Sequence, residues 1–387
     1  MAMALHVFLV LSLCLSYNLV VGRSGISEQE GPPGSQANQG NDFDCVDIYE
    51  QPAFDHPLMK NHKIQHRPSF SIGSMKGTPS YVGEVAEIEQ IRGGEGCPPG
   101  KVPIHRIKSN HLANADSSSD SNIDQTRHFA TIDTLEKTTL LHGAGAYIGV
   151  YNPQPALVNQ FSKAQVWLQR GPPNELNIIE VGWAVHRSLY DDNGTHLTAY
   201  WTIDNRRKTG CYNAYCPGFV QVDSRIALGA RYIDISTVGG QQYHIQVLVK
   251  QDNSTGHWWL IYLNNIAIGY WPKELFSHMA NGASFVRYGG ETLTSLDGVS
   301  PPMGSGELPS TLLNVADYFA VVVSVDENYA TTDVNPDRLK KNCDTGTAYY
   351  DLLYLGDQGG FLKQTFSFGG PGGKRSNLHG NGSSQLT

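Results

Sequence analysis

The chain has 387 residues, of which 40% are hydrophobic and 17% charged, a composition that is typical of folded proteins and excludes a disordered chain. The formal net charge of −8 excludes a broad basic surface, so neither nucleic acid nor a membrane surface is an expected partner. The 41 glycines and 19 tyrosines favour an all-β protein that is rich in turns.

The N-terminal residues predict a signal peptide. Val7 to Leu15 form an almost unbroken apolar run that is too short to span a bilayer. Small residues at Val20 and Gly22 suit a signal peptidase, so we expect a signal peptide over 1–22 and a secreted, extracellular product, destined for the cell wall, a vacuole or an external fluid. Residues 23–43 follow as a polar leader with almost nothing to bury.

The cysteines agree with an oxidising compartment. After removal of the signal peptide, pairing by segment predicts the disulfides Cys45–Cys97 and Cys211–Cys216, and leaves Cys343 over. The chain contains no CxxC pair and no HExxH motif, so we expect no zinc site and no cofactor. Three sequons predict N-glycosylation, at Asn193, Asn253 and Asn381.

Residues 23–127 differ in composition from the strand-rich remainder of the chain. Their ordered part, about 44–108, has two cysteines, proline-rich turns and an amphipathic stretch at Val85–Ile91 that suggests a short helix. Residues 109–127 are polar and rich in serine, as in an exposed linker where proteases cut.

From about Phe129 onward the sequence predicts many short β-strands. Segments such as AYIGVYN, AQVWLQRG, NIIEVGWAVH, HLTAYWTID, YHIQVLVK and HWWLIYLNN are rich in β-branched and aromatic residues and end at Gly, Pro, Asn or Asp. Helical periodicity is confined to Lys273–Ala280. Strands at this spacing indicate a sandwich or a barrel, here one domain over 128–387.

Two glutamates are candidates for chemistry. If NIIEVGWAVH is a strand, Ile179, Val181, Trp183 and Val185 face a core and Glu180 lies on the opposite face beside Gly182. Glu291 follows Gly289-Gly290, where backbone can be approached closely. The simpler interpretation makes each glutamate a solvated surface residue. If both instead share a cleft, the pair can hold one proton and activate a water for amide or glycosidic hydrolysis.

Two other motifs are interpreted as decoys. Asp344-Thr345-Gly346 resembles half of an aspartic-protease signature, but no second copy exists and no apolar strand precedes it. Ser305 in MGSGE lacks the first glycine of a nucleophile elbow, because Met303 stands there. We interpret the Asp344 motif as a turn, and no Ser-His-Asp arrangement is indicated for Ser305.

Blocks along most of the chain resemble the neprosin family. CVDIYEQPAFDHPL and GCPPGKVPI are similar to its activation peptide. AQVWLQRGP, NIIEVGWAV, YWTIDN, TGCYNAYCPGFVQV, GYWPKELF, VRYGGE, MGSGELP and GGPGG are similar to successive blocks of its catalytic domain. The sequence departs from the family pattern at Tyr288 and Glu307, and by the absence of a final cysteine that would pair with Cys343.

The resemblance implies a fold, an activity and a site. The family is mainly from plants, secreted and made as a zymogen, with a catalytic domain that is a sandwich of two antiparallel sheets. It implies a glutamic endopeptidase that acts at acid pH, plausibly after proline, with Glu180 and Glu291 as catalytic residues. The expected partners are a peptide or protein substrate, including proline-rich ones, and the chain's own propeptide, at 23–127, as an inhibitor that covers the cleft. Tyr200, Tyr212 and Trp183 are the expected aromatic neighbours of the cleft.

Two alternative functions do not involve hydrolysis. A sandwich face lined by tyrosine and tryptophan suits a glycan as well as a peptide, so a carbohydrate-binding module is the first alternative. The second is an extracellular interaction protein that keeps the fold without the chemistry. An intact glutamate pair argues against both.

Overall fold

The computed structural model describes residues 42–72, 75, 83–106, 125–135, 139–155, 157–263, 265–374 and 383–385. The predicted signal peptide, the polar leader, most of the predicted linker and the sequon at Asn381 lie outside these residues. Residues 41–387 form one compact unit.

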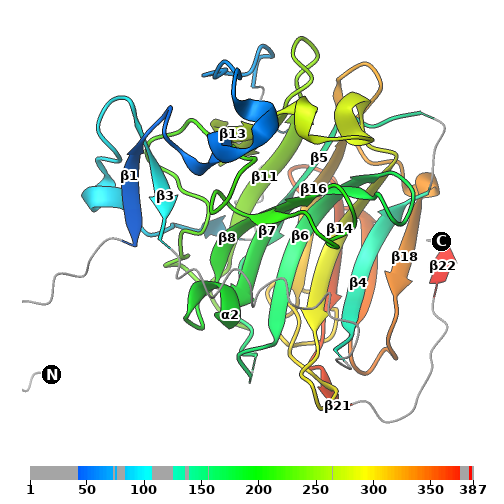
Figure 1. Ribbon diagram of the computed structural model, residues 1–387. Coiled ribbons are helices and arrows are strands. Elements are labelled where there is room, and N and C mark those ends of the chain that lie inside the picture. The colour runs from blue at the N-terminus through cyan, green and yellow to red at the C-terminus, as the bar shows by residue number, and fades with distance from the viewer. Residues whose placement is uncertain are drawn as a thin grey trace, which may run out of the picture. The chain divides into compact units, whose positions relative to one another are not determined.

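The described residues form two large antiparallel sheets, as expected for an all-β sandwich (Figure 1). The first has eight strands in the order β22-β18-β4-β14-β6-β7-β8-β9. Their bounds are β4 Arg127–Thr134, β6 Phe161–Arg170, β7 Asn177–His186, β8 His196–Thr202, β9 Cys211–Tyr212, β14 Phe285–Leu293, β18 Leu339–Cys343 and β22 Ser383–Gln385. Every strand expected at AQVWLQRG, NIIEVGWAVH and HLTAYWTID is present in this sheet.

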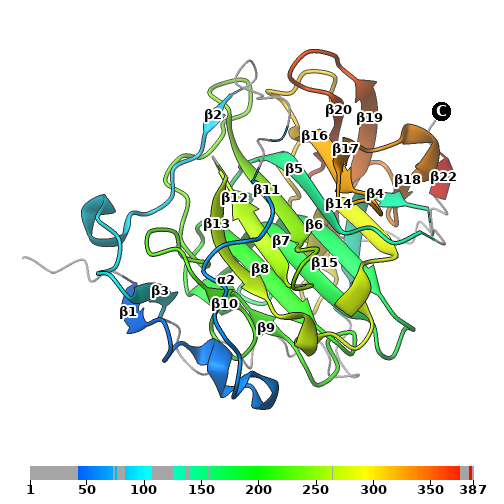
Figure 2. The same ribbon diagram turned by 90° about the horizontal axis from the view of Figure 1, so that it is seen from above.

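The second large sheet has ten strands. Eight follow the order β10-β13-β12-β11-β5-β16-β20-β19, while β17 pairs with β16 and β2 pairs in parallel with β11. Their bounds are β2 Glu84–Val85, β5 Gly143–Gly149, β10 Val220–Gln221, β11 Tyr243–Gln251, β12 Trp258–Tyr262, β13 Ile266–Trp271, β16 Asp317–Val325, β17 Thr331–Asp333, β19 Asp351–Asp357 and β20 Gln364–Gly369. Figure 2 shows β11, β12 and β13 stacked against β6, β7 and β8.

Short elements complete the described fold. Two small sheets pair β1 Phe43–Asp47 with β3 Lys101–His105, and β15 Val299–Ser300 with β21 Gly373–Lys374. In the part of the chain that the structure describes, the α-helical turn is α2 Arg187–Tyr190, and 3-10 turns occupy Pro52–Asp55, Pro57–Met59, Ile91–Gly94, Lys273–Leu275, Met279–Asn281 and Pro336–Arg338.

The helix predicted at Val85–Ile91 is wrong. Backbone groups there bond to other strands: β2 pairs with β11, Ala86 donates to the carbonyl of His244, and Ile88 bridges Tyr232. Hydrogen bonding of this segment to β11 outweighed the weak amphipathic pattern that suggested a helix. The Lys273–Ala280 helix is reduced to two separate 3-10 turns.

The core lies between the two sheets, where their inward faces meet. On β7 the inward residues are Ile179, Val181, Trp183 and Val185, as the alternation predicted. They pack with inward residues of the ten-stranded sheet, among them Ile148, Val247, Leu260, Phe319 and Phe366. Glu180 and its alternate neighbours therefore lie on the opposite, outward face of the eight-stranded sheet.

Residues 42–106, here called the pro-segment, pack on the outward face of the ten-stranded sheet. Ala53 and Met59 share a cluster with Leu248, Trp259 and Tyr270 of that sheet. Gln51 exchanges two hydrogen bonds with the backbone of Gln221, at 3.1 and 2.7 Å. The described residues of the pro-segment contact this sheet and its adjoining loops, and His105 also contacts Tyr190, His196 and Tyr215 at the β8–β9 side of the eight-stranded sheet. The expectation that residues 23–127 cover the cleft stays a prediction.

The two disulfides predicted from the sequence are both present, Cys45–Cys97 within the pro-segment and Cys211–Cys216 beside β9. Cys343 is buried and unpaired. In the described part of the chain, no helix is long and apolar enough to cross a membrane.

Candidate active site

Glu180 and Glu291 lie on one face of one sheet. Glu180 of β7 stands opposite Trp167 of β6 and Tyr200 of β8, and Glu291 of β14 stands opposite Lys163 of β6. Directly opposed residues of antiparallel strands point to the same side, as do residues two or four apart on one strand. The outward face that carries both carboxylates is called the glutamate face below.

Both carboxylates are buried and both face cations. Glu180 is 0% exposed and Glu291 is 1% exposed, so the interpretation of either as a solvated surface residue is wrong. The Arg206 guanidinium is ion-paired with Glu180. Glu291 Oε1 lies 2.5 Å from Nη1 of Arg127, and its Oε2 lies 3.8 Å from the fully buried Nζ of Lys163.

The two glutamates do not lie side by side. Glu180 lies on β7 and Glu291 on β14, the two strands that flank β6. In the middle of these strands, Gly289, Gln165 and Gly182 stand opposite one another in one row. Each glutamate lies two residues from that row, in opposite directions along the sheet. Diagonal neighbours on adjacent strands are about 7–8 Å apart, so the two glutamate backbones are separated by about 15 Å with Gln165 midway. In this structure each of the two carboxylates has its own cation.

The cations decide the charge state of Glu291. Burial would raise the pKa of this carboxyl, but the charges of Arg127, Lys163 and Arg206 and the hydrogen bond from Arg127 outweigh burial and lower the pKa. Burial acts against the charge of Arg127 too, yet Glu291 raises the pKa of that guanidinium. Glu291 is consequently an ionised carboxylate in this structure, even in mild acid.

A tight loop after β8 positions Arg206. Asp204 accepts hydrogen bonds from the backbone N–H groups of Arg207, Lys208 and Thr209, at 2.9–3.2 Å. Arg206 itself adopts a left-handed conformation with φ of 61°. Its side chain is 21% exposed and covers the fully buried Glu180, as Arg127, also 21% exposed, covers Glu291.

Aromatic rings border the glutamate face on the β8–β9 side. Tyr200 stands opposite Glu180 and Tyr212 opposite Tyr200, with their ring centroids 4.7 Å apart. These two expected cleft neighbours are therefore correctly placed. Trp183 is not, because it faces the core and donates from Nε1 to the carbonyl of Gly149 at 2.7 Å.

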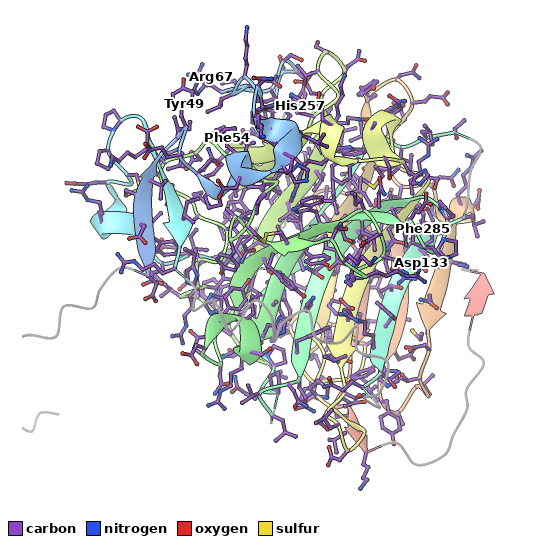
Figure 3. The ribbon with its side chains drawn as sticks, in the orientation of Figure 1. Tyr49, Phe54, Arg67, Asp133, His257 and Phe285 are labelled. Atoms are coloured by element: carbon purple, nitrogen blue, oxygen red, sulfur yellow. A yellow bond between two sulfur atoms is a disulfide. The ribbon has the colours of Figure 1, made fainter. Side chains whose placement is uncertain are left out.

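The opposite border is formed by β4 and β14. Arg287 donates to both carboxylate oxygens of Asp133, at 2.8 and 2.7 Å, and lies over the ring of Phe285. Figure 3 labels Asp133 and Phe285 together at this edge. Tyr288, which departs from the family pattern, points into the core and donates to the carbonyl of Val323.

The remaining sequence candidates have structural roles. Asp344 accepts hydrogen bonds from the ring of His128 and from the backbone of Phe129, so it anchors the start of β4. Ser305 lies in a turn, where its hydroxyl accepts from the backbone of Glu307. Asn193 and Asn253 are exposed, as glycosylation requires.

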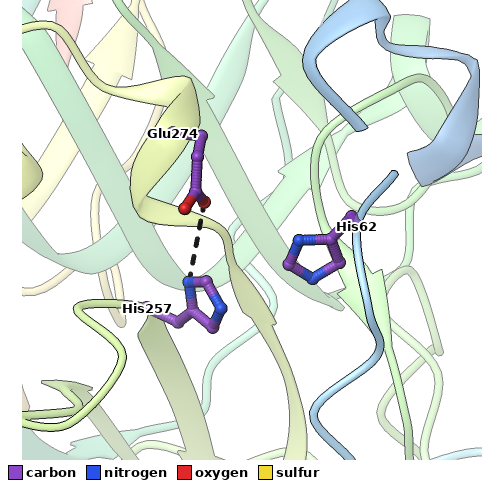
Figure 4. A group of neighbouring side chains, drawn as sticks. All are labelled: His62, His257 and Glu274. Carbon is purple, nitrogen blue, oxygen red and sulfur yellow. Dashed lines mark ion pairs between the residues drawn. The ribbon is translucent and has the colours of Figure 1, made fainter. Parts of the chain in front are cut away.

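One group of side chains among the described residues offers three possible metal ligands. His62 of the pro-segment, His257 and Glu274 have ligand atoms within 4.8 Å of one another (Figure 4). His257 Nδ1, however, accepts the backbone N–H of Lys273 at 3.2 Å, and His62 Nε2 is hydrogen-bonded to the hydroxyl of Tyr270 at 2.7 Å. Hydrogen bonds thus occupy one nitrogen of each ring, which fits neutral histidines better than a ligand set.

Sequence reasoning missed four residues of the glutamate face: Arg127, Lys163, Gln165 and Arg206. Lys163 and Gln165 alternate with Trp167 on β6, so all three side chains point to the same face. This alternation was the sequence signal that could have grouped them. Arg127 is the first residue of β4 but was assigned to the predicted linker, and Arg206 comes from a loop, where strand alternation does not predict the direction of a side chain.

Comparisons with known proteins agree with the blocks quoted above. Residues 158–371, more than half of the chain, match the family model described as Neprosin, and residues 35–145 match the model described as Neprosin activation peptide. Among solved structures, a scytalido-glutamic peptidase bound to a transition-state analog inhibitor is similar over 64% of this chain and 98% of its own, with 11% identity and a TM-score of 0.36. A toad ovary galectin bound to thio-digalactose covers 43% of this chain and 91% of its own, with 10% identity and a TM-score of 0.20.

Proposed function

The chain belongs to the neprosin family, and we propose that it is a secreted glutamic endopeptidase, made as a zymogen, that hydrolyses peptide bonds at acid pH, including bonds after proline. The observation that carries this proposal is the pair of buried glutamates on one sheet face, each held by a cation. Two disulfides and exposed sequons at Asn193 and Asn253 support secretion. The proposed boundaries are a signal peptide at 1–22, a propeptide at 23–127 and a catalytic domain at 128–387.

The lowered pKa of Glu291 supports a role for this residue as the base. Lys163 lies on the strand beside Glu291 and is fully buried, so its positive charge continues to favour the ionised form of that carboxylate after the propeptide is removed. We therefore assign Glu291 as the base that takes a proton from water, and Glu180 as the acid. The water oxygen attacks the carbonyl carbon, the C–N bond breaks, and Glu180 gives its proton to the leaving nitrogen. Transfer of the proton from Glu291 back to Glu180 restores the starting state.

Inhibition before activation is proposed to involve Arg127. This residue is the last of the predicted propeptide, and its guanidinium lies over Glu291. Because the pKa of Glu291 is lowered, the ion pair is present above the ordinary carboxyl pKa and is lost only when the pH falls through the lowered value. Mild acid therefore does not break the ion pair between Arg127 and Glu291. We propose that cleavage of the chain, or release of the pro-segment from the ten-stranded sheet, is needed to remove Arg127.

Docking of the pro-segment supplies a group that does respond to mild acid. His62 of the pro-segment faces His257, with ring centroids 5.3 Å apart, and Tyr270 stacks on His257. Burial lowers the pKa of His62, and it lowers the pKa of His257 to about 4, although Glu274 opposes both shifts. Asp252 favours and Lys273 disfavours the charged form of His257.

We predict that docking of the pro-segment weakens as the pH falls from about 6.5 to about 4. The undocked histidines bind protons near their ordinary pKa of about 6.5, whereas the docked ones do not, so the stabilisation is complete above that pH and is lost below it. The expected loss is roughly 1–2 kcal/mol after allowance for solvent screening. Limited proteolysis of 42–106 across this pH range measures it.

Variants separate this effect from general acid unfolding. His257→Gln keeps an acceptor for the backbone N–H of Lys273 but cannot be charged, so the pH dependence should become flatter. His66→Gln, at an exposed position four residues from His62, is the control and should behave like the parent chain. An unchanged pH profile in His257→Gln contradicts the prediction.

The direct test of the proposed function is peptide cleavage. The chain freed of residues 1–127 is incubated at acid pH with a proline-containing peptide, and the products are identified by mass spectrometry. Internal cleavage that requires both glutamates supports a glutamic endopeptidase. Glycan binding without any hydrolysis would favour the binding-module alternative.

A further inference from the structure

Besides the two glutamates, the glutamate face carries a third buried polar side chain, Gln165, which has no hydrogen-bond partner in this structure. Gln165, in the middle of β6, is fully buried, and neither its carboxamide oxygen nor its nitrogen is hydrogen-bonded in this structure. Burying an unsatisfied amide costs about 1–3 kcal/mol, and most buried polar atoms in proteins are satisfied. A glutamine here therefore needs an explanation that packing does not supply.

The two residues directly opposed to Gln165 place no side chain beside its carboxamide. The directly opposed residues are Gly182 on β7 and Gly289 on β14, neither of which has a side chain. Diagonally across those same strands stand Glu180 on one side and Glu291 on the other. Gln165 thus lies midway, in the strand register, between the backbones of the two glutamates.

Backbone packing explains the glycines but does not explain the glutamine. A Cβ at Gly182 would lie 2.0 Å from the carbonyl oxygen of Ala164, and Gly289 has φ of 142°, so both positions require glycine whatever faces them. An apolar side chain of similar length at position 165 would fill the same space with no unsatisfied polar atoms. The unsatisfied amide of Gln165 is therefore best explained by a hydrogen bond to a ligand.

We propose that Gln165 is a third catalytic residue, which donates a hydrogen bond from its carboxamide nitrogen to the carbonyl oxygen of the peptide bond being cleaved. This inference rests on the proposed function, because it takes the reacting carbonyl to lie between Glu180 and Glu291. As water adds to the carbonyl carbon, negative charge develops on that oxygen, and a fixed donor stabilises it more than it stabilises the substrate. A neutral amide keeps its donor at every pH at which the two carboxyl groups work.

The substrate class follows from this placement. A carboxamide donor between an acid and a base suits an uncharged acyl group, such as a peptide bond in an extended chain that crosses the strands. Tyr200 and Tyr212 border one end of that path and Phe285 the other. The carboxamide oxygen, which also lacks a partner here, remains free to accept from a substrate N–H.

The test compares Gln165→Met with the parent in the chain freed of residues 1–127. Methionine keeps the length and removes the amide, so we expect kcat to fall about 10²–10³-fold, the usual cost of one oxyanion donor, with KM changed less than about threefold. Because an unsatisfied buried amide is removed, the melting temperature should stay the same or rise. Gln241→Met, at an exposed position next to the ten-stranded sheet, is the matched control and should keep the parent's kcat and KM.

Each outcome decides one question. An unchanged kcat in Gln165→Met, while Glu180→Gln and Glu291→Gln are inactive, overturns the role of Gln165 and leaves the proposed function standing. Activity that survives in both glutamate variants overturns the proposed function itself. If Gln165→Met does not fold, Gln165→Asn keeps the amide and withdraws it by one methylene. Loss of kcat in that variant, with an unchanged melting temperature, supports the role, and full kcat contradicts it.

Discussion

Glu291→Gln lowers kcat for peptide hydrolysis by at least about 10²–10⁴-fold, because glutamine keeps the shape of the side chain and cannot take a proton from water. Glu180→Gln is expected to have an effect in the same range, since the amide cannot protonate the leaving nitrogen. KM should change much less than kcat, because both groups act mainly in the transition state. Steady-state kinetics with a proline-containing peptide at acid pH measure both constants.

Each glutamine substitution also removes an ion-pair partner, which can destabilise the fold, so the kinetic comparison needs stability controls. In Glu291→Gln, Arg127 and Lys163 lose a buried counter-ion, so stability can fall by several kcal/mol. Circular dichroism and thermal unfolding must therefore show a folded variant before kcat is compared. Glu175→Gln changes a glutamate of the β6–β7 turn whose side chain is 66% exposed, and should retain parental activity. Parental kcat in both Glu180→Gln and Glu291→Gln would remove the basis for a glutamic mechanism.

Trp183→Ala is expected to have the largest effect on stability. The ring of Trp183 is fully buried between the sheets and donates to the carbonyl of Gly149, so truncation leaves a cavity and an unpaired carbonyl. The free energy of unfolding should fall by about 3–5 kcal/mol, as measured by chemical denaturation. Molecules that remain folded should keep their kcat, because this side chain lies on the face opposite the glutamates.

Trp183→Phe is the matched variant for this prediction. It keeps most of the ring and loses only the hydrogen bond from Nε1, which should cost about 1–2 kcal/mol. Selective loss of kcat with unchanged stability, in either tryptophan variant, would mean that Trp183 lines the cleft and that the two faces of β7 have been assigned the wrong way round.

Alternation along the strands made much of the fold and part of the site predictable. NIIEVGWAVH separates four apolar residues from Glu180, and the structure places those four in the core. The same rule, applied to the short runs between turn residues, located β5, β6, β8, β11 and β12. The Gly289-Gly290 pair made Glu291 a weak candidate, and the resemblance to family blocks strengthened the choice of both glutamates.

The rest depended on long-range pairing, which a single sequence does not contain. Nothing local predicts that β6 lies between β7 and β14, and so nothing local predicts that Gln165 separates the two glutamates. Arg206 reaches Glu180 from a loop whose conformation is set by Asp204. The helix expected at Val85–Ile91 failed for the same reason, since β11 takes up its backbone groups.

The most direct test of the central claim follows the chain without its signal peptide by intact mass, at neutral and at acid pH. The account predicts loss of roughly the first hundred residues in acid only, with a new N-terminus near His128, and no processing in Glu291→Gln under the same conditions. Acid processing that proceeds equally in Glu291→Gln, or a parent chain that stays intact and cleaves no peptide after its propeptide is removed by another protease, would contradict it.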